Sequence, residues 1–257
     1  MLGVSRMRHK WWVWVLVALA GVVLATALGF VIWAETPLGP MPEAVAAMET
    51  DEQVTVVEND VIVFSPNATT PTVGLVFYPG ARIDPVSYAP PLHTLAAQGF
   101  LVVLVPMPLN LAVLGSNRAA DVIADFPEIG RWVMAGHSLG GAMAAAFVAS
   151  GDSAVDGLAL WGAYPSSGDD LSDWVGRVTS ISATNDGLTT PEDIARTTPL
   201  LPVTTEFAIV DGGNHAQFGW YGEQGGDGAA TISREDQQSQ TVDATLRLLR
   251  AVETPGN

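Results

Sequence analysis

The chain of 257 residues contains no cysteine and few basic residues. Without cysteine there are no disulfides, no thiol nucleophile and no thiolate metal site. Only eleven residues are Lys or Arg against 27 Asp or Glu, and three of those eleven (Arg6, Arg8 and Lys10) precede the first acid, Glu35. The chain from Glu35 onward therefore has eight basic residues against 27 acidic ones. Such a surface repels polyanions, so we expect no nucleic-acid partner.

Residues 11–34 form an uninterrupted apolar run, WWVWVLVALAGVVLATALGFVIWA, with no charged side chain. About 20 residues cross the hydrocarbon core of a bilayer, whereas the apolar region of a cleaved signal peptide has only about 7–15. Tryptophans lie at both ends, and the basic cluster comes before the run. These features predict a cytoplasmic basic segment at 1–10 and a transmembrane signal-anchor helix at 11–34. The remaining chain would then lie outside the cell membrane; the alternative is secretion after signal cleavage.

Residues 35–53 contain three prolines and several acids, which is typical of a stalk or linker. We expect at most a short helix at 43–49. The pattern then changes at Val54, which is where we place the start of a domain that runs to residue 257.

Short apolar, β-branched runs alternate with helical segments in this domain. Eight runs predict strands: 54–57, 61–64, 73–78, 100–105, 131–135, 157–162, 178–183 and 206–210. Helices are expected at 87–98, 117–126, 139–150, 191–196 and 233–252. The central strands are apolar throughout, as in a sheet buried on both faces. We therefore predict an α/β fold with a mostly parallel eight-stranded sheet, helices on both faces, and an antiparallel hairpin at one edge.

The segment RWVMAGHSLGGAMAAAFVAS contains the pattern G-x-S-x-G around Ser138. An apolar strand leads into the pattern and an alanine-rich helix leads out, as a nucleophile elbow requires. Small flanking residues allow a tight turn that exposes the serine hydroxyl at a helix N-terminus, where negative charge is favoured. Ser138 is the candidate nucleophile. The alternative is an ordinary glycine-rich turn.

A serine hydroxyl needs a base to accept its proton. Of the four histidines, His9 flanks the apolar run, and His93 lies in a helix before the nucleophile. His137 adjoins Ser138, with a side chain expected to point away from the hydroxyl. His215 follows the last strand, at the sheet edge where Ser138 emerges, and is the candidate base.

The acid that orients the base should lie between nucleophile and histidine in the chain. Asp186 satisfies this order, just past the seventh predicted strand, although its Asn-Asp-Gly context also suits an exposed turn. Asp211 is the main rival, but it lies only four residues before His215 and more plausibly braces the loop. Asp169 and Asp170 come one strand earlier and are weaker candidates.

An oxyanion hole needs two backbone N–H donors. One is expected from Leu139, directly after the nucleophile. The other is expected from Ala81 in the loop YPGARIDP that follows the third strand, where Gly80 provides room. A simple strand exit is the alternative for this loop.

With this triad in order, the chain resembles the α/β-hydrolase superfamily, and within it the small bacterial esterase-like branch related to dienelactone hydrolases. The stretches that carry the resemblance are YPGARIDPVSYAP, LVPMPLNLAVL, GHSLGG, SATNDGLT and GGNHAQFGWYG. The resemblance implies a Ser-His-Asp triad, an oxyanion hole, a small-molecule acyl substrate, and no metal or organic cofactor. The chain departs from dienelactone hydrolases in having no cysteine. It departs from many lipases in having Tyr78-Pro79-Gly80 in place of a His-Gly turn.

Only 15 residues, AYPSSGDDLSDWVGR, separate the strands at 157–162 and 178–183, so we expect little or no lid and an open site. Candidate pocket walls are Leu109, Asn110, Tyr164, Phe218 and Trp220, with ordinary loop packing as an equal alternative. The expected function is a serine hydrolase that cleaves carboxylic esters through an acyl-enzyme. The alternatives are an acyltransferase or thioesterase with the same triad, and a non-catalytic surface binding protein of the same fold.

Overall fold

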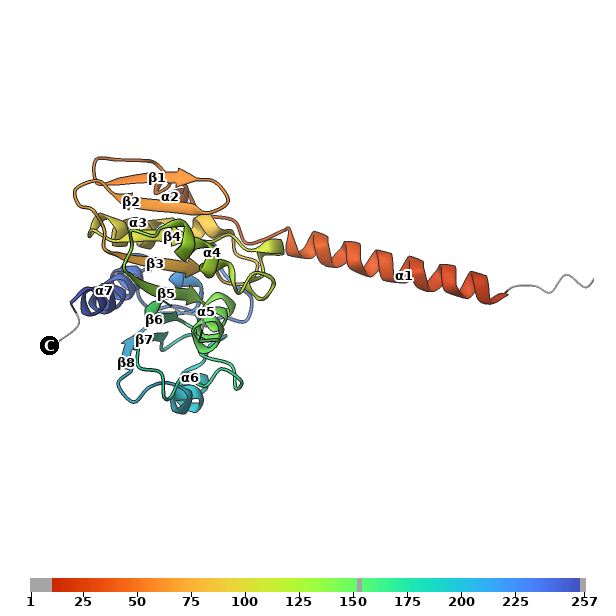
Figure 1. Ribbon diagram of the computed structural model, residues 1–257. Coiled ribbons are helices and arrows are strands. Elements are labelled where there is room, and N and C mark those ends of the chain that lie inside the picture. Colours follow the sequence, from red (N-terminus) through yellow and green to blue (C-terminus); the bar gives the residue numbers. More distant parts are fainter. Residues whose placement is uncertain (1–10, 152–153, 255–257) are drawn as a thin grey trace, which may run out of the picture.

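An eight-stranded sheet runs through the centre of the molecule (Figure 1). The computed structural model describes residues 11–151 and 154–254. The strands are β1 (Val54–Glu58), β2 (Ile62–Pro66), β3 (Val73–Tyr78), β4 (Leu101–Leu104), β5 (Arg131–His137), β6 (Val155–Trp161), β7 (Arg177–Ala183) and β8 (Glu206–Val210). Their order is β1-β2-β4-β3-β5-β6-β7-β8. Strands β1, β2 and β4 pair antiparallel, and all other neighbours pair parallel. The predicted sheet and its edge hairpin are therefore confirmed.

Seven α-helices lie within the described residues. They are α1 (Trp11–Ala34), α2 (Pro42–Ala46), α3 (Ala89–Ala97), α4 (Arg118–Asp125), α5 (Leu139–Ala149), α6 (Pro191–Thr197) and α7 (Arg234–Glu253). Helix α3 begins later than predicted because Pro85–Tyr88 forms a 3₁₀ turn, capped by the Asp84 carboxylate on the Val86 N–H. The predicted positions of α4, α5, α6 and α7 agree with the structure to within one or two residues.

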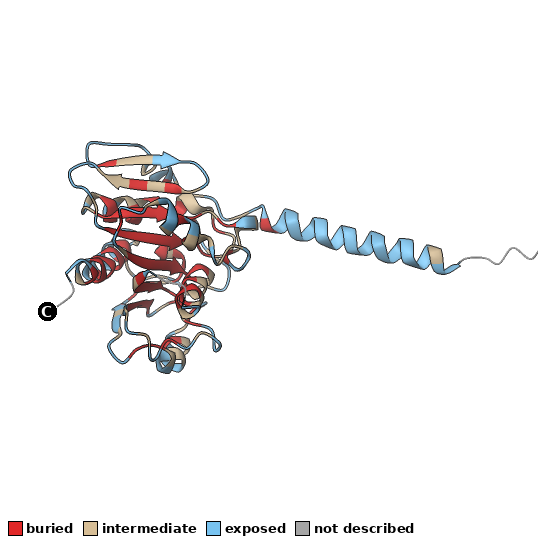
Figure 2. Ribbon diagram, viewed as in Figure 1, coloured by how far each residue is buried: buried red, intermediate tan, exposed pale blue. Residues whose placement is uncertain are grey.

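The central strands are buried on both faces, which explains why their sequences do not alternate. Leu75 and Phe77 of β3 pack into a core with α3 and α7, whereas Val76 and Tyr78 pack into a second core with α4 and α5. Figure 2 shows this buried zone along the middle of the sheet and on the inner faces of the helices. The sheet thus forms the middle of three layers, as expected for a doubly covered parallel sheet.

Helix α1 leaves the rest of the molecule as a single rod (Figure 1) and is exposed along nearly its whole length (Figure 2). It is long and apolar enough to cross a membrane. Its 24 residues correspond to about 36 Å at 1.5 Å per residue. The predicted basic segment at 1–10 lies outside the described residues.

Residues 35–53, expected as a stalk, instead run along the surface of the domain. Leu38 pairs with Ile83 and Pro40 with Tyr221 in isolated β-bridges. The short helix α2 buries Ala44 completely, so the predicted helix at 43–49 is present but shorter and starts one residue earlier. The backbone pairing explains why this proline-rich segment is not a free linker: its N–H and C=O groups find partners on the domain.

Candidate active site

Ser138 lies between the end of β5 and the start of α5, in a strained backbone conformation. Its φ of 54° and ψ of −126° are unusual for a residue with a side chain. The neighbouring glycines are required by close backbone approach. A Cβ on Gly136 would lie 2.5 Å from the carbonyl carbon of Gly140, and a Cβ on Gly140 would lie 2.2 Å from the carbonyl oxygen of Tyr78. The G-x-S-x-G spacing therefore has the structural cause that a nucleophile elbow requires.

His215 and Asp186 form a buried hydrogen-bonded pair. The Nδ1 of His215 lies 2.8 Å from Oδ2 of Asp186, and neither side chain is exposed to solvent. The other carboxylate oxygen accepts hydrogen bonds from the backbone N–H groups of Leu188 and Thr189, at 2.9 and 2.6 Å. Because a carboxylate only accepts, Nδ1 carries a proton, and in the neutral imidazole the lone pair is then on Nε2. That Nε2 has no hydrogen-bond partner within the described structure.

The ring of His215 packs against the residue before the nucleophile. The ring centroids of His137 and His215 are 4.4 Å apart, which brings the base to the elbow that bears Ser138. Within the described residues no hydrogen bond joins Ser138 to His215. In ligand-free enzymes this bond is often long and tightens only when substrate enters. The structure thus brings the three predicted triad residues to one edge of the sheet.

His137 and Tyr88 form a second buried contact that the sequence did not reveal. The Tyr88 hydroxyl lies 2.7 Å from Nδ1 of His137 and accepts a hydrogen bond from the backbone N–H of Gly80. Burial holds the pKa of His137 well below its usual value, and a proton on the neighbouring His215 would lower it further. His137 is therefore neutral, and its Nδ1 shares one hydrogen bond with the Tyr88 hydroxyl. Through these two hydrogen bonds, Tyr88 connects the loop after β3 with the elbow after β5.

The two amides predicted to form an oxyanion hole are both free of internal acceptors in the described structure. In the loop after β3, the N–H of Gly80 donates to Tyr88 and that of Arg82 donates to the carbonyl of Asn110, which leaves Ala81 between them unpaired. Leu139 is the first residue of α5, where a backbone N–H has no intrahelical acceptor. The unpaired N–H groups of Ala81 and Leu139 are therefore consistent with the predicted oxyanion hole.

Asp227 holds the loop that carries the candidate base, and sequence reasoning missed it. Its Oδ1 accepts hydrogen bonds from the N–H groups of Gly187, His215 and Gly228 at 3.1, 3.1 and 2.8 Å. Its Oδ2 accepts from Ala216 at 2.8 Å. One carboxylate thus fixes the turn after Asp186 relative to the turn at His215. No motif marks Asp227, because all of its partners except Gly228 lie 11 or more residues away in the chain.

Replacing Asp227 with asparagine should lower kcat by about 10- to 100-fold, because a displacement of about 1 Å in a catalytic group has an effect of that order. The amide nitrogen of asparagine cannot accept, so at least one backbone N–H loses its partner. The measurement is steady-state ester hydrolysis beside a thermal melt. Asp243→Asn, an exposed change on α7 that removes the same charge, is the control and should leave kcat unchanged. Equal activities in the two variants would contradict the positioning role.

A cavity of about 260 Å³ opens beside Ser138. It is lined by Ser138, Leu139, Ala142, Ala163, Tyr164, Leu188 and Thr189. Among the five residues predicted as pocket walls, Tyr164 alone lines this cavity. Leu109 and Asn110 lie in the 3₁₀ turn Pro108–Asn110, where the Asn110 side chain bonds the end of α1 instead.

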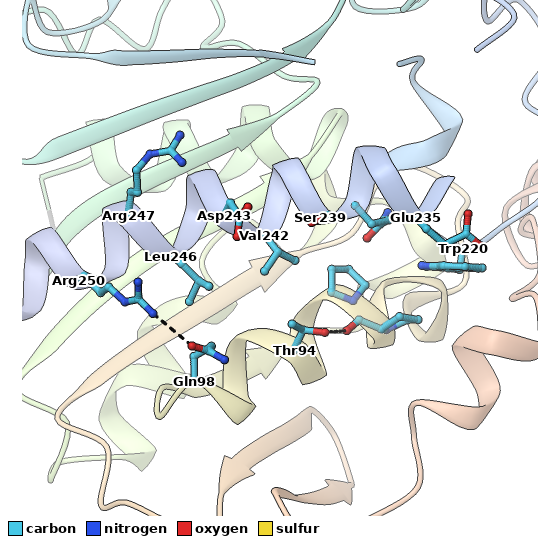
Figure 3. A pocket seen from close by; sticks show the side chains of 13 residues that line it. Thr94, Gln98, Trp220, Glu235, Ser239, Val242, Asp243, Leu246, Arg247 and Arg250 are labelled. Atoms are coloured by element: carbon cyan, nitrogen blue, oxygen red, sulfur yellow. Dashed lines mark hydrogen bonds between the residues drawn. The ribbon is translucent and has the colours of Figure 1, made fainter. Parts of the chain in front are cut away.

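The two aromatic residues predicted as pocket walls lie elsewhere. Phe218 is fully buried, with its ring 5.4 Å from that of His137, and it packs under Gly162 as part of the core. Trp220 lines a separate groove of about 590 Å³ between α3 and α7, together with Thr94 and Val242 (Figure 3). Neither residue lines the Ser138 cavity, because the loop after His215 directs one side chain into the core and the other toward the groove between α3 and α7.

Comparison with known proteins identifies the family. A model of the alpha/beta hydrolase family matches residues 74–239. The chain belongs to this family. The matched region includes the elbow, Asp186 and His215, and membership supports hydrolase activity. A comparison with curated protein sequences found no significant match.

Solved structures of similar fold include several esterases and hydrolases. The esterase domain of a Rhodothermus marinus protein is 14% identical with a TM-score of 0.57, over 77% of this chain and 98% of that one. A thermophilic esterase from Thermogutta terrifontis is 13% identical with a TM-score of 0.54, over 80% and 95%. A predicted hydrolase from Thermoplasma acidophilum is 14% identical with a TM-score of 0.54, over 76% and 98%. At these identities the likeness establishes the fold.

Proposed function

We propose that this protein is a serine hydrolase that cleaves carboxylic esters through an acyl-enzyme. The observation that carries the proposal is the buried hydrogen-bonded pair of Asp186 and His215. The Nε2 of His215 has no hydrogen-bond partner in the described structure, and its ring packs against the strained turn that bears Ser138. A buried carboxylate that orients an imidazole beside a partly exposed serine is the arrangement that activates a hydroxyl for acyl transfer.

In the proposed reaction, Oγ of Ser138 attacks the ester carbonyl while Nε2 of His215 takes the hydroxyl proton. The tetrahedral oxyanion accepts hydrogen bonds from the N–H groups of Leu139 and Ala81. Collapse expels the alcohol, which receives the proton from His215, and leaves an acyl group on Ser138. A water molecule then repeats the sequence and releases the acid, with Asp186 stabilising the imidazolium in both halves.

The cavity sets limits on the part of the substrate next to the reacting carbonyl. Its volume of about 260 Å³ lies below the range of about 300–1,000 Å³ typical of drug-sized ligand sites. Between β6 and β7 the chain has only a short connection, and no helix of that connection covers the site. The proposed substrate is a small or extended acyl ester that enters an open site.

We further propose that α1 is a retained anchor with the hydrolase domain on the extracytoplasmic side of the cell membrane. The basic residues before α1 support this orientation, because Lys and Arg beside a span favour the cytoplasmic side. Ala34, the last residue of α1, is fully buried against the domain, so the end of the helix is part of the folded structure.

A fluorophosphonate probe tests the proposed chemistry directly. The full-length protein in detergent should be labelled at a single serine, found by mass spectrometry in the peptide that contains Ser138, and should hydrolyse p-nitrophenyl butyrate. Heat-denatured protein is the control and should not react, because activation depends on the folded triad. A folded protein that resists the probe would instead be a non-catalytic binding protein of this fold.

A further inference from the structure

The end of α1 is fastened to two loops of the candidate active site. Arg82, directly after Ala81 in the loop that follows β3, donates from Nε to the carbonyl of Trp33 and from Nη2 to the carbonyl of Thr36, both at 2.7 Å. Its guanidinium also lies 4.3 Å from the centre of the Trp33 ring. From the loop after β4, Nδ2 of Asn110 donates to the carbonyl of Ala34 at 3.0 Å.

These contacts form a rigid joint. The last carbonyls of a helix have no intrahelical donor, and its C-terminus carries partial negative charge. A guanidinium and an amide satisfy those carbonyls, and the positive charge of Arg82 lies at the negative end of the helix. Two backbone bonds between Leu38 and the Arg82–Asp84 turn continue the joint past the helix end. No flexible spacer separates the apolar helix from the domain.

The joint lies on the same edge of the sheet as the candidate nucleophile. Strands β3, β4 and β5 are parallel neighbours, so their carboxyl ends lie at one edge. The loops after β3, β4 and β5 contain Arg82, Asn110 and Ser138, respectively. Figure 1 shows α1 projecting from this edge and away from the sheet. A bilayer crossed by α1 must therefore lie in front of the carboxyl edge.

The length of α1 places the surface of the bilayer close to the candidate active site. The helix extends about 36 Å and a hydrocarbon core is about 30 Å thick, so its last turn is at the interface. Val113 and Leu114, more than half exposed in the turn directly after Asn110, lie at this edge. Leu188, which lines the Ser138 cavity, is 38% exposed.

We propose that this carboxyl edge rests on the lipid bilayer, with Val113 and Leu114 in contact with it, and that the substrate is an ester dissolved in the lipid phase. The substrate assignment rests on the proposed ester hydrolysis, whereas the contact with lipid rests only on the proposed membrane anchor. Such an ester reaches Ser138 from the bilayer without crossing bulk water. The acidic excess of the domain favours a surface of zwitterionic or uncharged lipid.

A depth measurement tests the contact independently of activity. The chain has no cysteine, so Val113→Cys provides a single labelling site for an environment-sensitive fluorophore in the full-length protein. Val203→Cys is the matched control, because Val203 is fully exposed in the segment before β8, at the opposite edge of the sheet. In phosphatidylcholine vesicles the Val113 probe should emit at shorter wavelength and be quenched by spin-labelled lipid. Equal, water-like emission and quenching at both sites would overturn the proposal.

An activity comparison tests the substrate class. The full-length protein in the same vesicles is given the oleate ester of a fluorogenic alcohol, which dissolves in the bilayer, and the acetate ester, which dissolves in water. The double change Val113→Asp and Leu114→Asp should lower oleate turnover by about tenfold, because charges oppose interfacial contact. Acetate turnover should be unchanged, and Val203→Asp should alter neither rate.

The outcomes separate the two proposals. An equal loss on both esters, or none on the oleate, would overturn the lipid-phase substrate while leaving ester hydrolysis in place. A wild-type protein that cleaves neither ester would overturn the proposed function and the substrate class with it. The depth measurement would then still decide whether the carboxyl edge contacts the bilayer.

Discussion

Replacement of Ser138 with alanine is expected to abolish ester hydrolysis, with a fall in kcat of about 10⁶-fold, the order found when a serine hydrolase loses its nucleophile. Without Oγ there is no atom to form the acyl-enzyme, and the Nε2 of His215 has no hydroxyl proton to accept. The binding cavity and the two free amides at Leu139 and Ala81 remain, so any residual rate comes from those groups alone.

The fold should survive this substitution. The Ser138 side chain makes no hydrogen bond that caps α5, and alanine meets the positive φ no worse than serine does. The measurement is hydrolysis of p-nitrophenyl butyrate by the full-length protein in detergent, with a thermal melt of each sample. Ser172→Ala, an exposed serine change distant in the chain from the elbow, is the control and should retain full activity. Unchanged turnover in Ser138→Ala would refute the nucleophile assignment.

The fold was predictable because its signals are local. Eight apolar runs identify the strands, and the central ones are apolar almost throughout because they are buried on both faces. The elbow was predictable because Gly136 and Gly140 flank the serine at the spacing that a tight strand-to-helix turn imposes. Candidate acid and base followed from chain order and strand ends, and the structure joins Asp186 to His215.

The parts that sequence reasoning missed depend on contacts between distant segments. Asp227 lies 40 residues from Gly187, which it binds, in a stretch with no periodic pattern. Tyr88 meets His137 across 49 residues, and no motif spacing links the two. The stalk prediction depends on proline and acid content, which cannot reveal that Arg82 binds the start of this segment and that Asn110 binds the residue just before it. Proximity to His215 in the chain likewise says nothing of where the side chains of Phe218 and Trp220 point.

Replacement of Asp186 with asparagine should lower kcat by about 10⁴-fold, the order observed when the orienting acid of a serine-hydrolase triad is made an amide. The N–H groups of Leu188 and Thr189 require an acceptor, so the amide oxygen must face them and the NH₂ group must face Nδ1 of His215. That Nδ1 must then accept, which moves the ring proton to Nε2. An imidazole with its proton on Nε2 cannot take one from Ser138.

Asp211→Asn is the matched comparison, because Asp211 was the rival acid and loses the same charge. In the structure its carboxylate accepts one hydrogen bond, from the Thr184 hydroxyl at 3.2 Å, and asparagine can still accept it. Its kcat should therefore stay within about twofold of the wild type, a difference of less than 0.5 kcal/mol in activation free energy. Both variants are assayed with p-nitrophenyl butyrate after their melts are matched. A larger loss in Asp211→Asn than in Asp186→Asn would transfer the orienting role to the rival. Similar small losses of kcat in both variants would mean that the buried Asp186–His215 pair only stabilises the loop. Another group would then determine which nitrogen of His215 carries the proton.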